Sequence, residues 1–278
     1  MQFLIHGHSA YAAGGGRAHE AGRPLAVFVH GAGLDHTAWA LQSRWLAFHG
    51  WNVLAVDLPG HGRSDGPLLA DVGAMADWVL AVIAAAGGAP ATVIGHSLGS
   101  LVALEAAARA PAAVDRLVLI GSAATMPVHP DLLAAAQAND HAAIDMVNLW
   151  GYGYAAGIGG SAAPGVWMLG AGERILERAA PGVLHNDLAA CNAFTTGLDA
   201  ASRVRAPTLL VSGTKDQMTP LKSARTLATA IAGSTLVALE GAGHMLLAER
   251  PDELLQALQA HLRVDPSRGR GATVPAAR

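Results

Sequence analysis

The sequence predicts an α/β fold, with a mostly parallel central sheet, helices on both faces of the sheet and one helical insertion. Short apolar runs rich in β-branched residues recur along the chain, as strands require. Segments with helical spacing of apolar residues separate most of these runs, which is typical of parallel sheets covered by helices. The alternation stops between Gly121 and Val204 and then resumes, which indicates an insertion.

The predicted strands and helices follow one another from the N-terminus. The apolar runs cover residues 2–5, 25–29, 53–56, 91–94, 117–120, 208–211 and 235–239. The first run, together with a second strand predicted near Ser9 to Ala13, favours an antiparallel hairpin at one edge of the sheet. Residues 74–86 and 98–109 have the apolar spacing of helices.

The domain organisation follows from where this alternation is interrupted. We expect residues 1–122 and 205–264 to form one core, because the strand pattern resumes after the interruption. Residues 123–204 are rich in helical segments and glycine and are predicted to form a cap over the sheet. Residues 265–278 contain Pro, Gly, Arg and Ala without periodicity, which predicts a mobile tail.

Composition narrows the classes of partner. A hydrophobic share of 52% predicts a well-filled core, and a net charge of −3 without a basic, aromatic stripe argues against nucleic acid. No apolar run is long enough to span a bilayer, and the first residues lack the pattern of a secretory signal. The single cysteine, Cys191, excludes an internal disulfide, so we expect a cytoplasmic protein. The expected partner is a small-molecule substrate rather than a membrane, and a homodimer is left open.

A candidate nucleophile lies in the segment Gly95-His96-Ser97-Leu98-Gly99. It follows the strand predicted at 91–94 and precedes the helix predicted at 98–109. The turn between them is so tight that glycine is needed on both sides of the serine, and the serine itself is held in a strained conformation. The N-terminus of the helix directs free N–H groups to the place where an oxyanion would form.

A serine hydroxyl needs a base and a group that orients the base. Asp216 follows the strand predicted at 208–211, and His244 follows the strand predicted at 235–239. In a parallel sheet both loops open at the same edge as the serine turn. We therefore expect Ser97, Asp216 and His244 to be catalytic. Asp187 and Asp199, in or beside the insertion, are weaker candidates for the acid.

With these motifs, the chain from about Leu25 to Leu262, apart from the cap, resembles the α/β-hydrolase superfamily, and its serine esterases and lactonases in particular. The resemblance implies that His244 acts first as base and then as acid, and that Asp216 orients it. His30-Gly31-Ala32-Gly33 resembles the family's oxyanion loop, which implies backbone donors at Ala32 and Leu98. The alternative acid position of the family, after residues 117–120, holds Gly121-Ser122-Ala123-Ala124 and offers no carboxylate.

Other residues are assigned by their place beside these loops. His30 is expected to be a structural hydrogen-bonding group, and residues 57–64, another segment frequent in the family, are expected to shape a loop. Cap residues proposed for the pocket also include Met146, Trp167 and Met168, but such residues are more often core. Cys191 is expected to be buried or to line the pocket. The predicted substrate-binding residues are Gly31, His96, Met126, Trp150, Met218 and Met245.

No cofactor or metal is expected. Gly31-Ala32-Gly33 lacks the third glycine of a dinucleotide fingerprint, and the lysine of a phosphate-binding loop is missing. The chain has no HExxH motif, and His6-Gly7-His8 has no acidic or histidine cluster nearby in sequence.

The predicted function is a serine hydrolase that cleaves a small-to-medium, largely apolar carboxylic ester or lactone through an acyl-enzyme. Relatives that use an aspartate nucleophile are disfavoured because residue 97 is serine. Carbon–carbon bond hydrolases, acyltransferases, amidases and hydroxynitrile lyases keep the same triad and stay open. A small-molecule receptor of the same fold also stays open, because a fold outlasts its activity.

Overall fold

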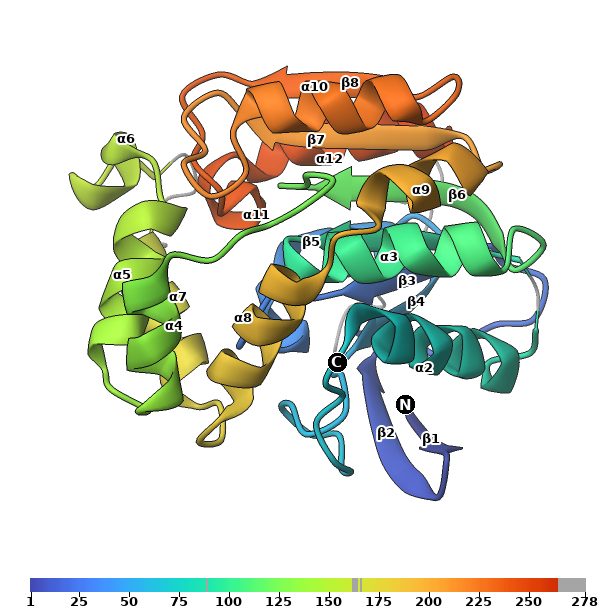
Figure 1. Cartoon of the computed structure of the whole chain (residues 1–278). Coiled ribbons are helices and arrows are strands. Elements are labelled where there is room, and N and C mark those ends of the chain that lie inside the picture. The colour runs from blue at the N-terminus through green and yellow to red at the C-terminus, as the bar shows by residue number, and fades with distance from the viewer. Residues whose placement is uncertain (89, 162–164, 166, 265–278) are drawn as a thin grey trace, which may run out of the picture.

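A computed structural model describes residues 1–88, 90–161, 165 and 167–264, and in this part of the chain eight strands form one sheet. Its order is β1-β2-β4-β3-β5-β6-β7-β8 (Figure 1). Strands β1 and β2 pair antiparallel, as do β2 and β4, and all other pairs are parallel. The strands are β1 (Gln2–Ile5), β2 (His8–Ala13), β3 (Leu25–Val29), β4 (Asn52–Val56), β5 (Ala91–His96), β6 (Val114–Ile120), β7 (Thr208–Gly213) and β8 (Thr235–Leu239).

The predicted mostly parallel sheet and its antiparallel edge hairpin are confirmed. Strands β3, β4 and β5 are buried along their whole length, as expected for strands covered on both faces. Strand β6 begins three residues before the predicted run at 117–120, at Val114. Its early part was missed because Asp115 is exposed and Arg116 partly exposed, so no continuous apolar run marks it.

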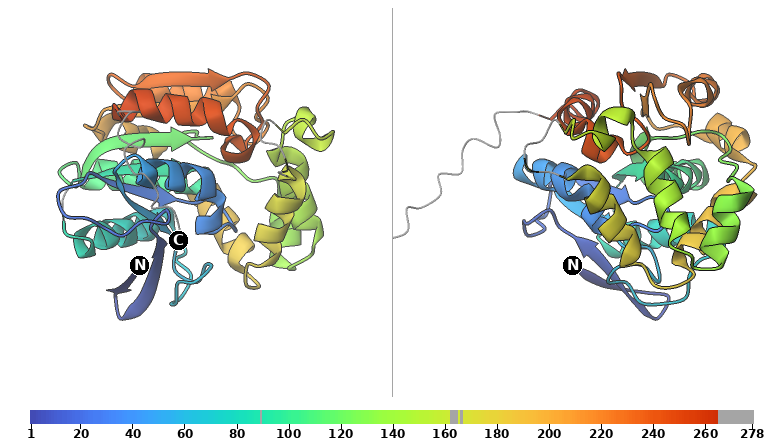
Figure 2. Two further views of the ribbon diagram at one scale, coloured as in Figure 1. Left: turned by 180° about the vertical axis from the view of Figure 1, so that it is seen from behind. Right: turned by 90° about the vertical axis from the view of Figure 1, so that its left-hand side faces the viewer.

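Helices cover both faces of the sheet, as predicted (Figures 1 and 2). Apolar side chains of α2, α3, α9 and α10 belong to one buried cluster, and those of α1, α11 and α12 belong to a second. The first group consists of α2 (Val72–Ala85), α3 (Leu98–Arg109), α9 (Gly197–Arg203) and α10 (Leu221–Ala230). The second consists of η1 (His36–Trp39), α1 (Ala40–Phe48), α11 (Leu246–Glu249) and α12 (Pro251–Leu262).

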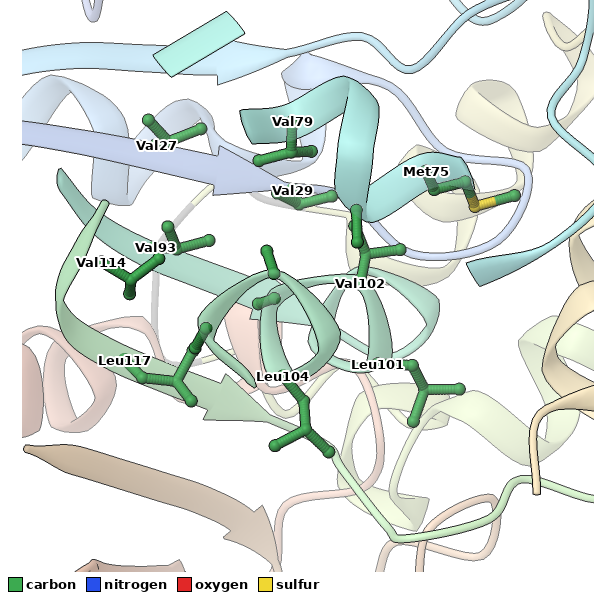
Figure 3. Close-up of a cluster of buried hydrophobic side chains, with 14 of the residues drawn as sticks. Val27, Val29, Met75, Val79, Val93, Leu101, Val102, Leu104, Val114 and Leu117 are labelled. Carbon is green, nitrogen blue, oxygen red and sulfur yellow. The ribbon is translucent and has the colours of Figure 1, made fainter. Parts of the chain in front are cut away.

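The core beneath α2 and α3 holds the candidate nucleophile's helix against the sheet. Figure 3 shows Val79 of α2 and Val102 of α3 directed towards Val27 and Val29 of β3 and Val93 of β5. All five side chains are fully buried. This dry, close packing fixes α3 relative to the sheet and so fixes the turn that joins β5 to α3.

The chain between β6 and β7 contains the helices of the predicted insertion. Five of them lie at the end of the sheet (Figure 1). We call these the cap helices: α4 (Pro130–Gln137), α5 (Ala142–Gly151), α6 (Tyr154–Gly157), α7 (Met168–Glu177) and α8 (Val183–Ala193). The next helix, α9, instead packs against α3 and α10. The boundaries of the insertion at 123 and 204 stay a prediction, and the predicted tail, 265–278, lies outside the described residues.

None of the helices in the described ranges combines the length and the apolar character that a membrane crossing requires.

Candidate active site

Ser97 lies in the turn between β5 and α3 with a strained backbone, at φ 54° and ψ −123°. A residue other than glycine rarely adopts a positive φ, so the packed strand and helix must hold it there. The flanking glycines are required by contact: a Cβ at residue 95 would lie 2.0 Å from the carbonyl oxygen of Gly99. One at residue 99 would lie 2.1 Å from the carbonyl oxygen of Val29. The turn therefore presents Ser97 at the end of the sheet.

Asp216 and His244 meet at the same end of the sheet. The Nδ1 of His244 lies 2.9 Å from the Oδ2 of Asp216, and both side chains are buried. The second oxygen of Asp216 accepts hydrogen bonds from the backbone N–H groups of Met218 and Thr219, at 2.9 and 2.8 Å. The carboxylate is thus fixed by its own loop and holds the imidazole in one orientation.

The electrostatics of this pair favour a charged carboxylate and a free second nitrogen on the ring. Burial alone would raise the pKa of Asp216, but the charge and hydrogen bond of His244 and the bonds from Thr219 hold this pKa below its ordinary value. The Nε2 of His244 is buried and has no hydrogen-bond partner among the described residues. With Nδ1–H donated to the carboxylate, Nε2 carries a lone pair that can accept a proton.

His96 and Gly121 contact the loop and the ring of His244. The Nε2–H of His96 donates to the backbone carbonyl of His244 at 2.9 Å. Burial and the neighbouring His244 lower the pKa of His96 to about 3, so the His96 ring is neutral. Gly121 lies against the imidazole, since a Cβ there would come within 3.0 Å of the Cε1 of His244. A side chain at residue 121 would crowd the ring and would also have to adopt the positive φ of 56° found there.

Two backbone N–H groups next to Ser97 have no backbone acceptor among the described residues. In the part of the chain that the structure describes, neither Ala32 nor Leu98 donates its N–H to a backbone carbonyl. Ala32 lines the same cavity as Ser97, and Leu98 follows the serine at the start of α3. His30, in the same loop, accepts from the N–H of Leu58 at 3.1 Å and lies 2.9 Å from the carbonyl of Gly31. His30 is therefore a structural hydrogen-bonding group, as predicted.

The cavity above Ser97 has two compartments, which share Ala32, Ser97, Leu188, Met218 and His244. The larger, of about 300 Å³, also contains the predicted residues Met126 and Trp150, together with Cys191. The smaller, of about 50 Å³, is lined by the predicted residues Gly31, His96 and Met245 and by cap residues that include Asn148. Each predicted substrate-binding residue therefore lines one compartment or both.

Other candidates from the cap lie elsewhere. Met146 packs among the cap helices, Met168 is buried beside Tyr152, and Trp167 is exposed, so none of the three lines either compartment. Asp199 is exposed and pairs with Arg203 at 3.1 Å. Asp187 is buried and pairs with His61 at 2.8 Å rather than with His244.

Sequence reasoning missed two contributions to the site. The hydroxyl of Thr219 donates to the Oδ2 of Asp216 at 2.7 Å and lies 3.2 Å from the Nδ1 of His244. A hydroxyl three residues after the acid is a local turn signal that could have been noticed. The backbone carbonyl of Gly151, at the end of α5, accepts from the N–H groups of His244 and Met245, at 2.7 and 2.9 Å. No local pattern predicts this contact between the cap and the histidine loop.

Two groups of His, Asp and Glu residues in the described ranges are close enough to hold a metal ion, and neither lines the cavity of Ser97. In the first, the oxygens of Asp57 already accept from the backbone N–H and the Nδ1 of His36 and from the N–H of Arg63. The second, His141 with Glu173 and Glu177, is occupied by ion pairs that include Arg174.

Comparisons with known proteins agree with this geometry. Residues 26–257 match the profile of the alpha/beta hydrolase family. The chain is 37% identical over 211 residues to the pimeloyl-[acyl-carrier protein] methyl ester esterase of Neisseria meningitidis serogroup B (strain H44/76), covering 70% of this chain and 76% of that protein.

The enol-lactonase from Burkholderia xenovorans LB400 has the same fold, with a TM-score of 0.84 at 24% identity over 95% of this chain and 100% of that one. The structure of a thermophilic esterase gives a TM-score of 0.79 at 27% identity, covering 95% of this chain and 96% of that one. The chain belongs to the alpha/beta hydrolase family.

Proposed function

We propose that this protein is a serine hydrolase that cleaves a small-to-medium, largely apolar carboxylic ester or lactone. The observation that carries the proposal is the free Nε2 of His244, held through Nδ1 by Asp216 in the cavity that contains Ser97. Nucleophilic catalysis requires a base that can come within hydrogen-bond reach of the nucleophile. Ser97 and His244 line the same cavity, and the Nε2 of His244 is bound to no other group among the described residues.

The reaction proceeds through two tetrahedral intermediates. Ser97 Oγ bonds to the carbonyl carbon while its proton passes to the Nε2 of His244, and the carbonyl oxygen takes the negative charge. The N–H groups of Ala32 and Leu98 donate to this oxyanion. The bond to the leaving oxygen then breaks, and His244 gives its proton to that oxygen. Water repeats the sequence on the acyl-enzyme, with His244 again as base, and frees the acid and Ser97.

The cavity supports an uncharged, apolar substrate. Among the described residues that line the larger compartment there is no Lys, Arg, Asp or Glu, and its apolar lining includes Met126, Val128, Leu132 and Leu188. A volume of about 300 Å³ lies at the lower end of the range for small-molecule sites. A substrate of this size with a neutral, mostly hydrocarbon acyl chain fits the compartment.

Within this class, a methyl ester is the substrate that we propose. The smaller compartment, of about 50 Å³, has room for roughly three to five heavy atoms, so it accepts the methoxy group of a methyl ester or another short alkoxy group. The name of the Neisseria relative, a methyl ester esterase, gives independent support. In this arrangement the acyl chain occupies the larger compartment.

The first experiment asks whether Ser97 is activated. The wild-type protein is expected to react with a fluorophosphonate probe, and Ser97→Ala and His244→Ala are expected not to react. Hydrolysis of methyl, ethyl, butyl and p-nitrophenyl esters of the same acids is then compared with that of lactones and amides. We expect kcat/KM to fall as the alkoxy group of the alkyl esters grows.

Two results would contradict the proposal. A wild-type protein that neither reacts with the probe nor hydrolyses any ester or lactone would indicate a binding protein of this fold. Hydrolysis that continues unchanged in His244→Ala would exclude His244 as the base.

The cellular location and the partners of the protein are proposed on separate grounds. We propose a cytoplasmic protein, on the basis of its single cysteine, with a small-molecule substrate as its partner. A homodimer stays a prediction.

A further inference from the structure

A second buried carboxylate joins the cap to the loop that carries the proposed oxyanion donor. Asp187, on α8, is 0% exposed, and its Oδ2 accepts two hydrogen bonds. One comes from the backbone N–H of Gly33, in the loop after β3, at 2.9 Å. The other comes from the Nε2 of His61, in the loop after β4, at 2.8 Å. Asp187 therefore connects three segments that are distant in sequence.

His61 balances the charge of this carboxylate. Its Nε2 faces Asp187 and its Nδ1 lies 3.0 Å from the backbone carbonyl of Pro59, so both ring nitrogens face acceptors and both must carry a proton. Burial alone would lower the pKa of His61, but the hydrogen bond and charge of Asp187 raise it above its ordinary value. The pair is thus an imidazolium beside a carboxylate, and it places no net negative charge next to the oxyanion site.

The hydrogen bond to Gly33 determines which N–H group of the oxyanion loop is left free. The N–H of Leu34 donates to the carbonyl of Gly31 at 3.2 Å, which makes residues 31–34 a turn with Ala32 and Gly33 at its centre. Gly33 has a φ of +69°, which glycine adopts without strain. Of the two central N–H groups, that of Gly33 is bound by Asp187, and that of Ala32 is left without a backbone acceptor in the described chain, beside Ser97.

We propose that Asp187, charge-balanced by His61, is a positioning residue of the oxyanion hole: the cap carboxylate fixes the 31–34 turn so that the Ala32 N–H points at the developing oxyanion. This inference rests on the proposed hydrolase function. It assigns to the cap a part in transition-state stabilisation, in addition to covering the substrate. The expected signature is a loss of kcat with little change in KM, because the oxyanion forms only after the substrate has bound.

The test compares Asp187→Ala with Asp187→Asn. In Asp187→Ala the Gly33 N–H loses its acceptor, and kcat is expected to fall about tenfold, less than the 10²- to 10³-fold expected when a donor is removed altogether. In Asp187→Asn the amide oxygen can still accept from Gly33, so most of kcat is expected to return. Asp199→Asn is the matched control, because it neutralises an exposed carboxylate on α9 whose partner is Arg203; its kcat should equal that of the wild type.

A tetrahedral analogue separates positioning from general damage. Ser97 adds to a trifluoromethyl ketone: its oxygen bonds to the carbonyl carbon, its proton goes to His244, and the ketone oxygen becomes an oxyanion. The Kd of this adduct should rise in Asp187→Ala by the same factor as kcat falls. The Kd of the matched methyl ketone, which binds without forming the adduct, should stay the same.

Two further measurements decide the proposal if turnover or folding fails. Hydrogen exchange of the peptide that contains residues 31–34 should be faster in Asp187→Ala than in the wild type or Asp199→Asn, and this readout does not need activity. If Asp187→Ala does not fold, the double variant Asp187→Leu/His61→Leu removes both charges together and should show the same loss of kcat and the same faster exchange.

The outcomes separate the two proposals. A variant without the carboxylate that keeps wild-type kcat, ketone affinity and slow exchange at residues 31–34 would overturn the role of Asp187 and leave the hydrolase function intact. A wild-type protein without any hydrolase activity would overturn the proposed function, and the exchange comparison would then decide alone whether Asp187 holds the turn.

Discussion

Two buried aspartate–histidine pairs lie near the cavity, one in the core loops and one between the cap and the core. The bond lengths are nearly equal, at 2.9 Å for Asp216–His244 and 2.8 Å for Asp187–His61. The surroundings of the rings differ. His244 uses Nδ1 for its carboxylate and keeps Nε2 without a partner among the described residues, whereas His61 uses Nε2 for its carboxylate and Nδ1 for the carbonyl of Pro59.

An aspartate–histidine pair alone therefore does not identify a catalytic base. A ring with one free nitrogen in a cavity can exchange a proton with a substrate. A ring whose two nitrogens both donate to protein acceptors has no such capacity, and it serves as a buried cation that joins two parts of the fold. Variants of the two histidines should therefore have opposite effects on activity and stability.

Loss of His244 should reduce activity more than any other change considered. His244→Ala should lower kcat/KM for a p-nitrophenyl ester by roughly 10⁴-fold or more, because no other group can take the proton of Ser97. Its free energy of unfolding in urea should fall by about 1.5 to 3 kcal/mol, because the Nδ1 bond to Asp216 is lost while the carboxylate keeps its bonds from Met218 and Thr219. The double variant Ser97→Ala/His244→Ala should be no slower than either single variant, since the two residues act as a unit. A double variant that is much slower would mean that the residues act separately.

His61→Ala should show the reverse pattern. Removing the imidazolium leaves the carboxylate of Asp187 buried and uncompensated, so the free energy of unfolding should fall by about 3 to 5 kcal/mol. Turnover of the folded fraction should fall by much less than in His244→Ala, because Asp187 still accepts from the Gly33 N–H and only its unbalanced negative charge now lies next to the oxyanion site. His185→Ala, at a partly exposed position two residues before Asp187 on α8, is the control and should cost less than about 1 kcal/mol. If His61→Ala and His185→Ala lower the free energy of unfolding equally, His61 and Asp187 do not form a stabilising buried ion pair.

A smaller effect on kcat is expected at Thr219, whose hydroxyl contacts the Asp216–His244 pair. Thr219→Val removes the hydroxyl that donates to the Oδ2 of Asp216, and a hydrogen bond to a charged group contributes about 1.5 to 3 kcal/mol. We expect kcat to fall about tenfold, with recovery in Thr219→Ser. If Thr219→Ser is as slow as Thr219→Val, the methyl group and not the hydroxyl supports the site.

The smallest effect is on the pH dependence of stability and concerns His30. The His30 ring lies 4.9 Å from the ring of His61. Burial and the positive charge of His61 lower the pKa of His30 to about 4. An unfolded histidine has a pKa of about 6.5, so below this pH the unfolded chain binds a proton that the folded chain does not, and stability falls as the pH falls.

His30→Gln should remove this contribution. Between pH 6 and pH 5, its free energy of unfolding should fall by about 1 kcal/mol less than that of the wild type, measured in urea at each pH. An identical decrease in both proteins would indicate that His30 is protonated in the folded state, which a charged His61 beside it disfavours.

The first pair was predictable from sequence, and the second was not. Asp216 and His244 each follow a clear apolar strand, and parallel topology brings such loops to one edge of the sheet. The helix at 98–109 was predicted with its observed bounds, because the tight turn at Ser97 starts it and the Pro111 region ends it. Local patterns were sufficient for these elements.

His61 and Asp187 are 126 residues apart and belong to no shared motif. The predicted role of residues 57–64 as a shaping loop agrees with Ser64, whose hydroxyl donates to the backbone carbonyl of Asp57. The partner of His61 depends on how α8 packs against the core, and such packing is set by tertiary contacts rather than by spacing in the sequence. The carbonyl of Gly151 beneath the histidine loop was missed for the same reason.

The contacts that join the cap helices to the core include one to the histidine loop, through the Gly151 carbonyl, and one to the oxyanion loop, through the Asp187 carboxylate. Moving the cap helices away from the core would break both contacts, so the histidine loop and the oxyanion loop would lose this support together. Pro127, His129 and Gln217 line the larger compartment and are exposed, so this compartment reaches the solvent with the cap in place. A substrate can therefore enter without breaking either contact.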